Sequence, residues 1–289
     1  MKNNLDILNL RVPTGKTVLM QHLQTLVLRG NPYWIGGVIS PAKLPALAAK
    51  LATRYPIQRD ERGRTYDRSK GLASAHFVAY PAANGTIAWW VLSSTGLGGL
   101  ADSKSPDAHV ARHALRANGH IEFDDYVLLY AHKKDARTFM DAKTGREKQV
   151  IKDCSTWTWK MTNVAYGHVM AAIERDVKDL NFGRDDIGHM DGLRGTLAYQ
   201  RRRPLFSGVR SQVLQLHREA DSAWGLVRKA WLGRYTQFAI KYGENAGRLR
   251  SLKEITSQHL PKMGRFKVFS DVTLGHLVRG DFPFSGAGN

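Results

Sequence analysis

The sequence predicts an α+β protein, with a mixed or antiparallel sheet in its N-terminal half and a mostly helical, basic C-terminal region. Up to residue 162, short runs of alternating apolar residues are interleaved with stretches of helical spacing, whereas beyond it the spacing is almost entirely helical. A chain of 289 residues, 43% of them hydrophobic, is long enough to bury a sizeable core. We expect an α+β domain over 1–162, a basic helical region over 163–260, and a short strand with a glycine-rich tail over 261–289.

The first 55 residues predict two successive strand–helix pairs. Alternating apolar residues predict a strand over 5–12, which Pro13 ends, and apolar residues at helical spacing then continue up to Gly30. A second strand over 33–40 and a second helix over 41–55 repeat this order.

Two hairpins are predicted next. Residues 75–95 predict the first hairpin, because the Asn84-Gly85 pair is typical of a two-residue turn. The runs 126–134 and 156–162 predict another pair of strands, and we expect a helix over 106–117 between the two hairpins.

Helices dominate the rest of the chain. Residues 163–180 have helical spacing, and a continuous apolar stripe follows Val209. The stripe consists of Val213, Leu216, Ala220, Ala223, Val227 and Ala230. A last strand is expected over 265–270.

The charge of the chain indicates a polyanionic partner. The 43 Lys and Arg residues against 25 Asp and Glu give a net charge of +18, which favours binding of phosphate polymers. The helical region carries arginines and tryptophans that we assign to RNA phosphates and unstacked bases. They are Arg201, Arg202, Arg203, Arg210, Arg218, Arg228, Arg248, Arg250, Trp224 and Trp231. The alternative is that the tryptophans only widen the core face and the arginines are solvated.

A second basic segment covers residues 54–71, which we expect to form a loop between a helix and a hairpin. Arg62, Arg64 and Arg68, with Tyr66 among them, would clamp a nucleic-acid backbone, because guanidinium is the preferred bidentate partner of phosphate. The acidic residues of the same segment offer internal ion pairs instead.

Motifs for nucleotide or metal chemistry are incomplete. The stretch 13–17 reads PTGKT, but the first glycine of a phosphate loop is replaced by Leu10. His109 and His113 have the spacing of two zinc ligands without the glutamate of a zinc peptidase. The single cysteine, Cys154, excludes an internal disulfide and a multi-thiolate zinc site. We therefore expect no metal and no cofactor.

RNA cleavage needs neither a metal nor a cofactor. The 2′-hydroxyl of RNA can attack the neighbouring phosphate once a base removes its proton and cations neutralise the added charge. His22, at the edge of the apolar stripe of the first helix, is the candidate base. His76 and His217 compete for this role, and the alternative for His22 is a partly buried ring bonded to the backbone.

A strand–helix start with a histidine on the helix, a mixed sheet and an arginine-rich helical region resemble the repeat-RNA-processing endonucleases of CRISPR antiviral systems, in particular the type IV branch. The similarity concerns the order of elements over the first 100 residues, which include LDILNLRVPTGKTVLMQHLQTL, and the basic helices. It implies ferredoxin-like folds, recognition of a repeat hairpin, and metal-independent cleavage by an enzyme that stays bound to its product. The catalytic residue that it implies is His22.

RNA is favoured over DNA because four tryptophans are available for stacking and no helix-turn-helix is recognisable. The alternatives are a non-catalytic DNA-binding accessory protein of a plasmid or other mobile element, and a protein whose basic face binds an acidic protein or a membrane surface. Other subunits of a ribonucleoprotein complex are compatible partners. The chain has no apolar run near the ~20 residues of a membrane helix, and its N-terminus lacks a secretory pattern, so we expect a cytoplasmic protein.

Overall fold

The computed structural model describes residues 8–13, 15–82, 84–132, 134–140, 145, 147–178, 190–242, 260–264 and 269–280. Its helices and antiparallel sheets confirm the α+β class, and the N-terminal half is rich in sheet. The chain forms two compact units. Unit 1 consists of 1–121, 128–157 and 265–289, and unit 2 consists of 122–127 and 158–264.

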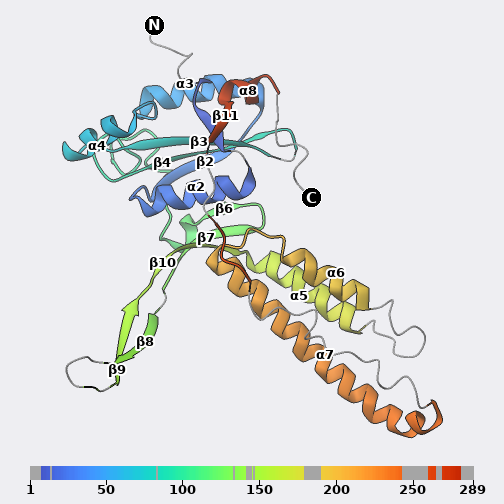
Figure 1. Cartoon of the computed structure of the whole chain (residues 1–289). Coiled ribbons are helices and arrows are strands. Elements are labelled where there is room, and N and C mark those ends of the chain that lie inside the picture. Colours follow the sequence, from blue (N-terminus) through green and yellow to red (C-terminus); the bar gives the residue numbers. More distant parts are fainter. Residues whose placement is uncertain are drawn as a thin grey trace. The chain divides into compact units, whose positions relative to one another are not determined.

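A four-stranded antiparallel sheet is the centre of unit 1 (Figure 1). Its strand order is β3-β4-β2-β5, formed by β3 (Ala75–Pro81), β4 (Ile87–Ser93), β2 (Tyr33–Ile39) and β5 (Arg112–His113). The predicted second strand and first hairpin are confirmed. Gly85 adopts a φ of 74° in the hairpin turn, a left-handed conformation that glycine tolerates without steric cost.

Helices cover both faces of this sheet (Figure 1). The helix α2 (Lys16–Leu28) lies on one face, and α3 (Leu44–Arg54), preceded by the short helix η1 (Pro41–Lys43), lies on the other. Buried apolar side chains of α3 pack against alternate residues of β3, including Ala75 and Ala79. The intervening residues of β3 therefore face α2.

The C-terminal segment completes unit 1. The strand β1 (Arg11–Pro13) pairs antiparallel with β11 (Phe269–Thr273), which continues into α8 (Leu274–Val278). Leu274 and Leu277 are buried in the same hydrophobic cluster as Val12 of β1. Of the two predicted strands, residues 5–7 and 265–268 lie outside the described residues. Residues 8–10 do not form a strand, and Pro13, which was expected to end the first strand, is part of β1.

Two sequence predictions in unit 1 are wrong. Residues 106–117 were expected to form a helix, but they form turns and β5, because Arg112 and His113 pair with β2 and Asp107 is held by Arg54 and Tyr55. The segment 54–71 was expected to be a loop, but it contains the helix α4 (Glu61–Ser69).

The start of α4 explains why this charged segment is helical. The Asp60 carboxylate accepts a hydrogen bond of 2.7 Å from the Gly63 N–H, which satisfies one of the backbone donors at the helix start. The buried Asp67 carboxylate pairs with the Arg59 guanidinium at 3.1 Å, which ties the helix to the residue that precedes its cap.

Two smaller sheets follow. The strands β6 (Ile121–Phe123), β7 (Tyr126–Ala131) and β10 (Thr156–Met161) form a sheet of order β10-β7-β6, which confirms the predicted pairing of the second strand pair. Between β7 and β10, β8 (Lys134–Met140) and β9 (Glu147–Asp153) form an antiparallel hairpin.

In the described part of unit 2, α5 (Asn163–Lys178) packs against α6 (Met190–Gln200) and α7 (Ser207–Tyr242). The first half of the apolar stripe of α7 is confirmed, since Val213, Leu216 and Ala220 are buried, whereas Ala223 and Val227 are only partly buried. None of the described helices is both long enough and apolar enough to cross a membrane.

Candidate functional site

Two histidines lie on the same side of the unit 1 sheet. His76 is on β3, the outermost strand of the sheet order, and it shares its face with the buried residues Val78 and Tyr80. This is the face that α2 covers, and α2 carries His22 at its middle. Both imidazoles are partly exposed.

The electrostatics of these histidines define a cluster. Burial, followed by the charges of Arg29 and Arg64, lowers the pKa of His22 from 6.5 to about 4. Burial also lowers the pKa of His76 to about 3, with further contributions from neighbouring charged groups. Those groups are Arg64, His22, Arg68 and Arg29. We name His22, Arg29, Arg64, Arg68 and His76 the histidine–arginine cluster.

Helix periodicity brings the cluster's members together. His22 and Arg29 are seven positions apart on α2, and this spacing of about two turns places them on one side of the helix. Arg64 and Arg68 are one turn apart on α4, and the Arg68 Nε donates a hydrogen bond to the Arg64 carbonyl at 3.4 Å. The Arg64 guanidinium itself donates to the Arg59 carbonyl.

A buried polar network fixes α2 relative to β3. The Asn31 amide donates to the Leu26 carbonyl at 2.9 Å, near the end of α2, and the Ser74 hydroxyl donates to Asn31 Oδ1 at 3.0 Å. The Ser74 N–H in turn donates to Ser94 Oγ at 2.9 Å. Since Ser74 is two residues before His76, this network holds the two histidine-bearing elements in place.

The cluster carries a strong positive charge. Glu61 lies 3.9 Å from Arg29, with both side chains largely exposed, and the charges of Glu61 and Asp60 act on Arg64. Exposed pairs of this kind contribute little. Three guanidinium groups that repel one another beside two rings of lowered pKa form a site that an anion would stabilise.

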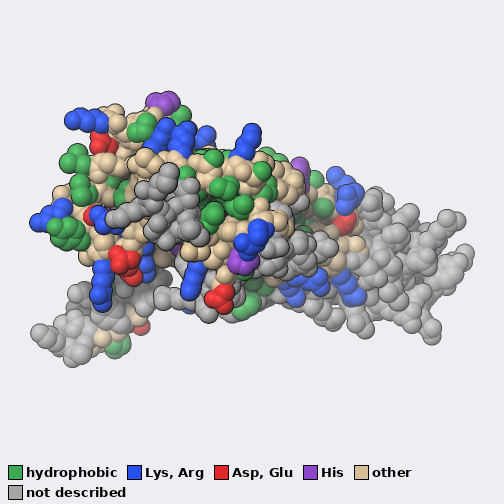
Figure 2. Space-filling view, turned by 90° about the horizontal axis from the view of Figure 1, so that it is seen from above, with side chains coloured by type: hydrophobic (Ala, Val, Ile, Leu, Met, Phe, Trp, Pro, Cys, Tyr) green, Lys and Arg blue, Asp and Glu red, His purple; other side chains and the backbone are tan. Residues whose placement is uncertain are grey.

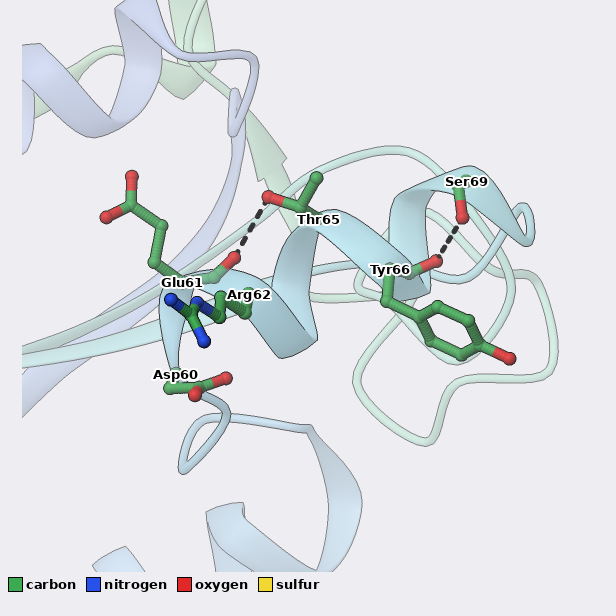
Figure 3. Close-up of a pocket in the computed structure, with 6 residues that line it drawn as sticks. All are labelled: Asp60, Glu61, Arg62, Thr65, Tyr66 and Ser69. Carbon is green, nitrogen blue, oxygen red and sulfur yellow. Dashed lines mark hydrogen bonds between the residues drawn. The ribbon is translucent and has the colours of Figure 1, made fainter.

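The sequence-predicted residues of α4 divide between two sides of the helix. The charge of Arg64 acts on both His22 and His76, and that of Arg68 acts on His76, whereas Arg62 and Tyr66 line an open groove (Figure 3). His76 was a competing candidate that proves to be a neighbour of His22. Arg29 lies beside His22, as its helical spacing in the sequence predicts, whereas nothing in the sequence pointed to Asn31.

The arginines of the helical region have different environments. Arg201 and Arg202 are exposed in the turn after α6, Arg218 is exposed on α7, and Arg210 is partly exposed there. Figure 2 shows Lys and Arg side chains at many places on one face of the molecule, with acidic side chains among them. The described arginines of the helical region other than Arg203 therefore lie at exposed or partly exposed positions of the surface.

Arg203 and Trp224 do not fit their expected roles. The Arg203 side chain is only 12% exposed, and its guanidinium donates to the Tyr126 hydroxyl at 3.0 Å and contacts Asp125 at 3.5 Å. It therefore binds within unit 2. Trp224 is 2% exposed, so its ring is packed in the core and offers no surface to a base.

Other residues with predicted roles are buried or lie outside the described residues. Trp157 and Trp159, which favoured RNA on sequence grounds, are also buried. The side chains of Arg228 and Trp231 lie outside the described part of α7, and Arg248 and Arg250 lie outside the described residues altogether. His217, the third histidine candidate, is 1% exposed within unit 2, and burial lowers its pKa to about 4.

Within the described residues, no group of three or more His, Cys, Asp or Glu side chains has a geometry that would hold a metal ion. Comparison with protein-family models, curated proteins and solved structures found no match to this chain.

The histidines should report directly on a bound phosphate. Both imidazoles are neutral at pH 7 in the free protein, because their pKa values of about 4 and about 3 lie below it. A phosphodiester among the arginines would favour the charged imidazolium and so raise both pKa values. We expect the NMR titrations of His22 and His76 to move to higher pH when a non-cleavable 2′-O-methyl RNA is added.

The exposed His109 provides the reference for this titration, because it lies outside the cluster. A shift of all three histidines by the same amount would indicate a general screening effect. Unchanged pKa values of His22 and His76 at saturating RNA would contradict phosphate binding at the cluster.

Proposed function

We propose that the protein binds RNA and cleaves it, without a metal ion, at the histidine–arginine cluster. The observation that carries the proposal is the convergence of two imidazoles with three guanidinium groups from α2, α4 and β3. General acid–base catalysis of phosphodiester cleavage requires a proton acceptor, a proton donor and cations near the phosphate. The cluster contains side chains suited to each task.

In the proposed reaction His22 accepts the proton of the RNA 2′-hydroxyl while O2′ attacks the adjacent phosphorus. The P–O5′ bond breaks, and the His76 imidazolium donates a proton to O5′. The products are a 2′,3′-cyclic phosphate and a 5′-hydroxyl. His22 then releases its proton to solvent and His76 takes one up from solvent, which restores both residues. The low pKa of His76 makes its imidazolium the stronger acid of the two.

The arginines act on the phosphate. Arg64 and Arg68 lie one turn apart and neutralise the charge that develops on the phosphoryl oxygens in the transition state. The negative phosphodiester also stabilises the protonated form of His76, because an adjacent anion raises an imidazole pKa. Substrate binding would therefore favour the imidazolium that the reaction needs as its acid.

The basic surface of unit 2 supplies the rest of the proposed RNA contact. Arg201, Arg202 and Arg218 are exposed there, and they would bind phosphates outside the scissile position. A CRISPR repeat hairpin with a single-stranded flank is the substrate that we propose, and retention of the cleaved product follows from these additional contacts.

Incubation of a repeat-hairpin RNA with the purified protein in EDTA tests the proposal. We expect cleavage that yields 2′,3′-cyclic phosphate ends and that is abolished by one 2′-deoxy substitution at the cleaved nucleotide. Products that require magnesium, or no products at all, would overturn the catalytic proposal. Binding of duplex DNA in preference to the RNA would favour a DNA-binding accessory protein instead.

A further inference from the structure

Arg64 brings its charge to both histidines of the histidine–arginine cluster, and a backbone carbonyl holds its side chain. The Arg64 guanidinium donates a hydrogen bond to the carbonyl of Arg59, the residue just before the Asp60 cap of α4. A long arginine side chain has many rotamers, so a fixed acceptor is needed to keep its charge in one place. The position of the Arg64 charge therefore depends on the position of the Arg59 carbonyl.

The Arg59 side chain runs along α4 and ends at Asp67. Its Nε lies 3.1 Å from Asp67 Oδ2. It passes over Gly63, since a Cβ atom at position 63 would lie 3.2 Å from Arg59 Cδ and 3.7 Å from Arg59 Cβ. Glycine is unfavourable inside a helix, but here any larger residue would crowd the path of Arg59. The sequence of α4 thus leaves room for the contact between Arg59 and Asp67.

The Asp67 carboxylate is buried, whereas its partner is mostly exposed. The Asp67 side chain is 4% exposed, against 57% for Arg59. Within the described residues, Asp67 Oδ1 accepts no hydrogen bond. A buried oxygen without a partner costs stability, so packing alone does not account for an acid at this position. The carboxylate is a fixed attachment point for the Arg59 side chain.

We propose that Asp67 is a positioning residue, which fixes Arg59 through its side chain so that the Arg59 carbonyl holds the Arg64 guanidinium at the histidine–arginine cluster. The contacts run from Asp67 Oδ2 to Arg59 Nε, and from the Arg59 carbonyl to the Arg64 guanidinium. The catalytic consequence rests on the proposed function, in which Arg64 acts on the phosphate. The position of the Arg64 charge involves no RNA and is tested in the free protein.

Asp67→Ala removes the attachment point and keeps a residue that favours the helix. The Arg64 charge should then move away from the cluster. Because that charge lowers the pKa of His22 and of His76, both NMR titrations of the free protein should move to higher pH. The direction is informative, since the loss of the negative charge of Asp67 alone would move them to lower pH.

Two further variants control this titration. Asp67→Asn keeps an oxygen that can accept from Arg59, so it should shift the histidines less than Asp67→Ala. Asp107→Ala is the matched control, because Asp107 pairs with another arginine of unit 1, Arg54, at 2.9 Å. It should leave both histidine titrations unchanged.

A double variant shows whether Asp67 acts through Arg64. Once Arg64→Met has removed the charge, adding Asp67→Ala should cause no further shift of His76. The charge of Arg68, on the same helix, also acts on His76. If Asp67→Ala instead unfolded α4, Arg68 would move away as well, and His76 would shift again in the Arg64→Met protein.

Cleavage of the repeat-hairpin RNA in EDTA measures the consequence for the reaction. Asp67→Ala should lower the single-turnover rate by about 10- to 100-fold, since a small displacement of a catalytic group can cost about 10²-fold. Binding of the 2′-O-methyl RNA should stay within about threefold of the parent. Asp67→Asn should recover most of the rate.

The outcomes separate this inference from the proposed function. Unchanged titrations of His22 and His76 in folded Asp67→Ala, or a further shift of His76 in the Arg64→Met protein, overturn the positioning role even when the parent protein cleaves RNA. A parent protein that neither binds nor cleaves RNA overturns the proposed function, and the titrations of the free protein still decide whether Asp67 positions Arg64.

Discussion

Replacing His76 with asparagine should lower the RNA cleavage rate by about 10²- to 10⁴-fold, the usual contribution of a general acid or base, and leave RNA binding within a few-fold. Asparagine keeps a polar side chain of similar size at the sheet edge but cannot transfer a proton. His22→Asn should have a comparable effect. Single-turnover cleavage in EDTA measures the rate, and anisotropy with non-cleavable RNA measures binding.

The double variant tests whether the histidines act as a pair. Residues that act as a unit have non-additive effects, so His22→Asn combined with His76→Asn should be little slower than either single change. His109→Asn is the matched control, because it removes an exposed histidine of unit 1 and should leave the rate unchanged. Full activity of the folded His76→Asn protein would exclude acid catalysis by this residue.

RNA affinity should fall by about 300- to 2,000-fold between 50 and 200 mM salt if six phosphates are bound, since each contact contributes about 0.7–0.9 to the slope of log affinity against log salt concentration. The large positive charge of the chain and the exposed arginines of both units are the physical cause. Affinity that does not depend on salt would rule out phosphate binding by these surfaces.

Removing Arg201 and Arg202 together should reduce that slope by about 1.5, which corresponds to two lost phosphate contacts, and should weaken binding of all RNA sequences similarly. Arg203 is left in place because its guanidinium binds Tyr126 within unit 2. The matched control replaces Arg175 and Lys178 of α5 with alanine, which removes the same charge from exposed positions of the same unit. Equal slopes for both double variants would show that only net charge matters.

Much of the fold could be predicted because the periodicity of apolar residues records which face of an element is buried. The strand over 33–40, the hairpin over 75–95 and the helix that closes at Gly30 follow that pattern. The helix α4 could not be predicted in this way, since its sequence has no apolar period. Its formation depends on the Asp60 cap and on the pair of the buried Asp67 with the exposed Arg59.

Only part of the candidate site could be predicted from the sequence. The roles of His22, Arg64 and Arg68 were proposed from residue type and local charge. Their convergence with His76 depends on β3 being the outermost strand, a property of the whole sheet.

Burial limited the predictions for unit 2. Arg203 is part of a run of three arginines, a pattern that is typical of an exposed surface. Its partners, Asp125 and Tyr126, are distant in sequence. Trp224 continues the apolar stripe of α7 into the core, where hydrophobic contacts determine its position. Neither of these long-range contacts can be predicted from local charge and spacing.

The pairing of β1 with β11 has a consequence for how the protein is made. Val12 needs Leu274 and Leu277 to complete its hydrophobic cluster, and these are translated after every described residue of unit 2. On the ribosome, unit 2 can therefore fold first, whereas β1 cannot pair until β11 has been synthesised. We infer that the nascent chain exposes this part of its core until β11 and α8 have been synthesised, and that chaperones which bind apolar segments have their longest opportunity there.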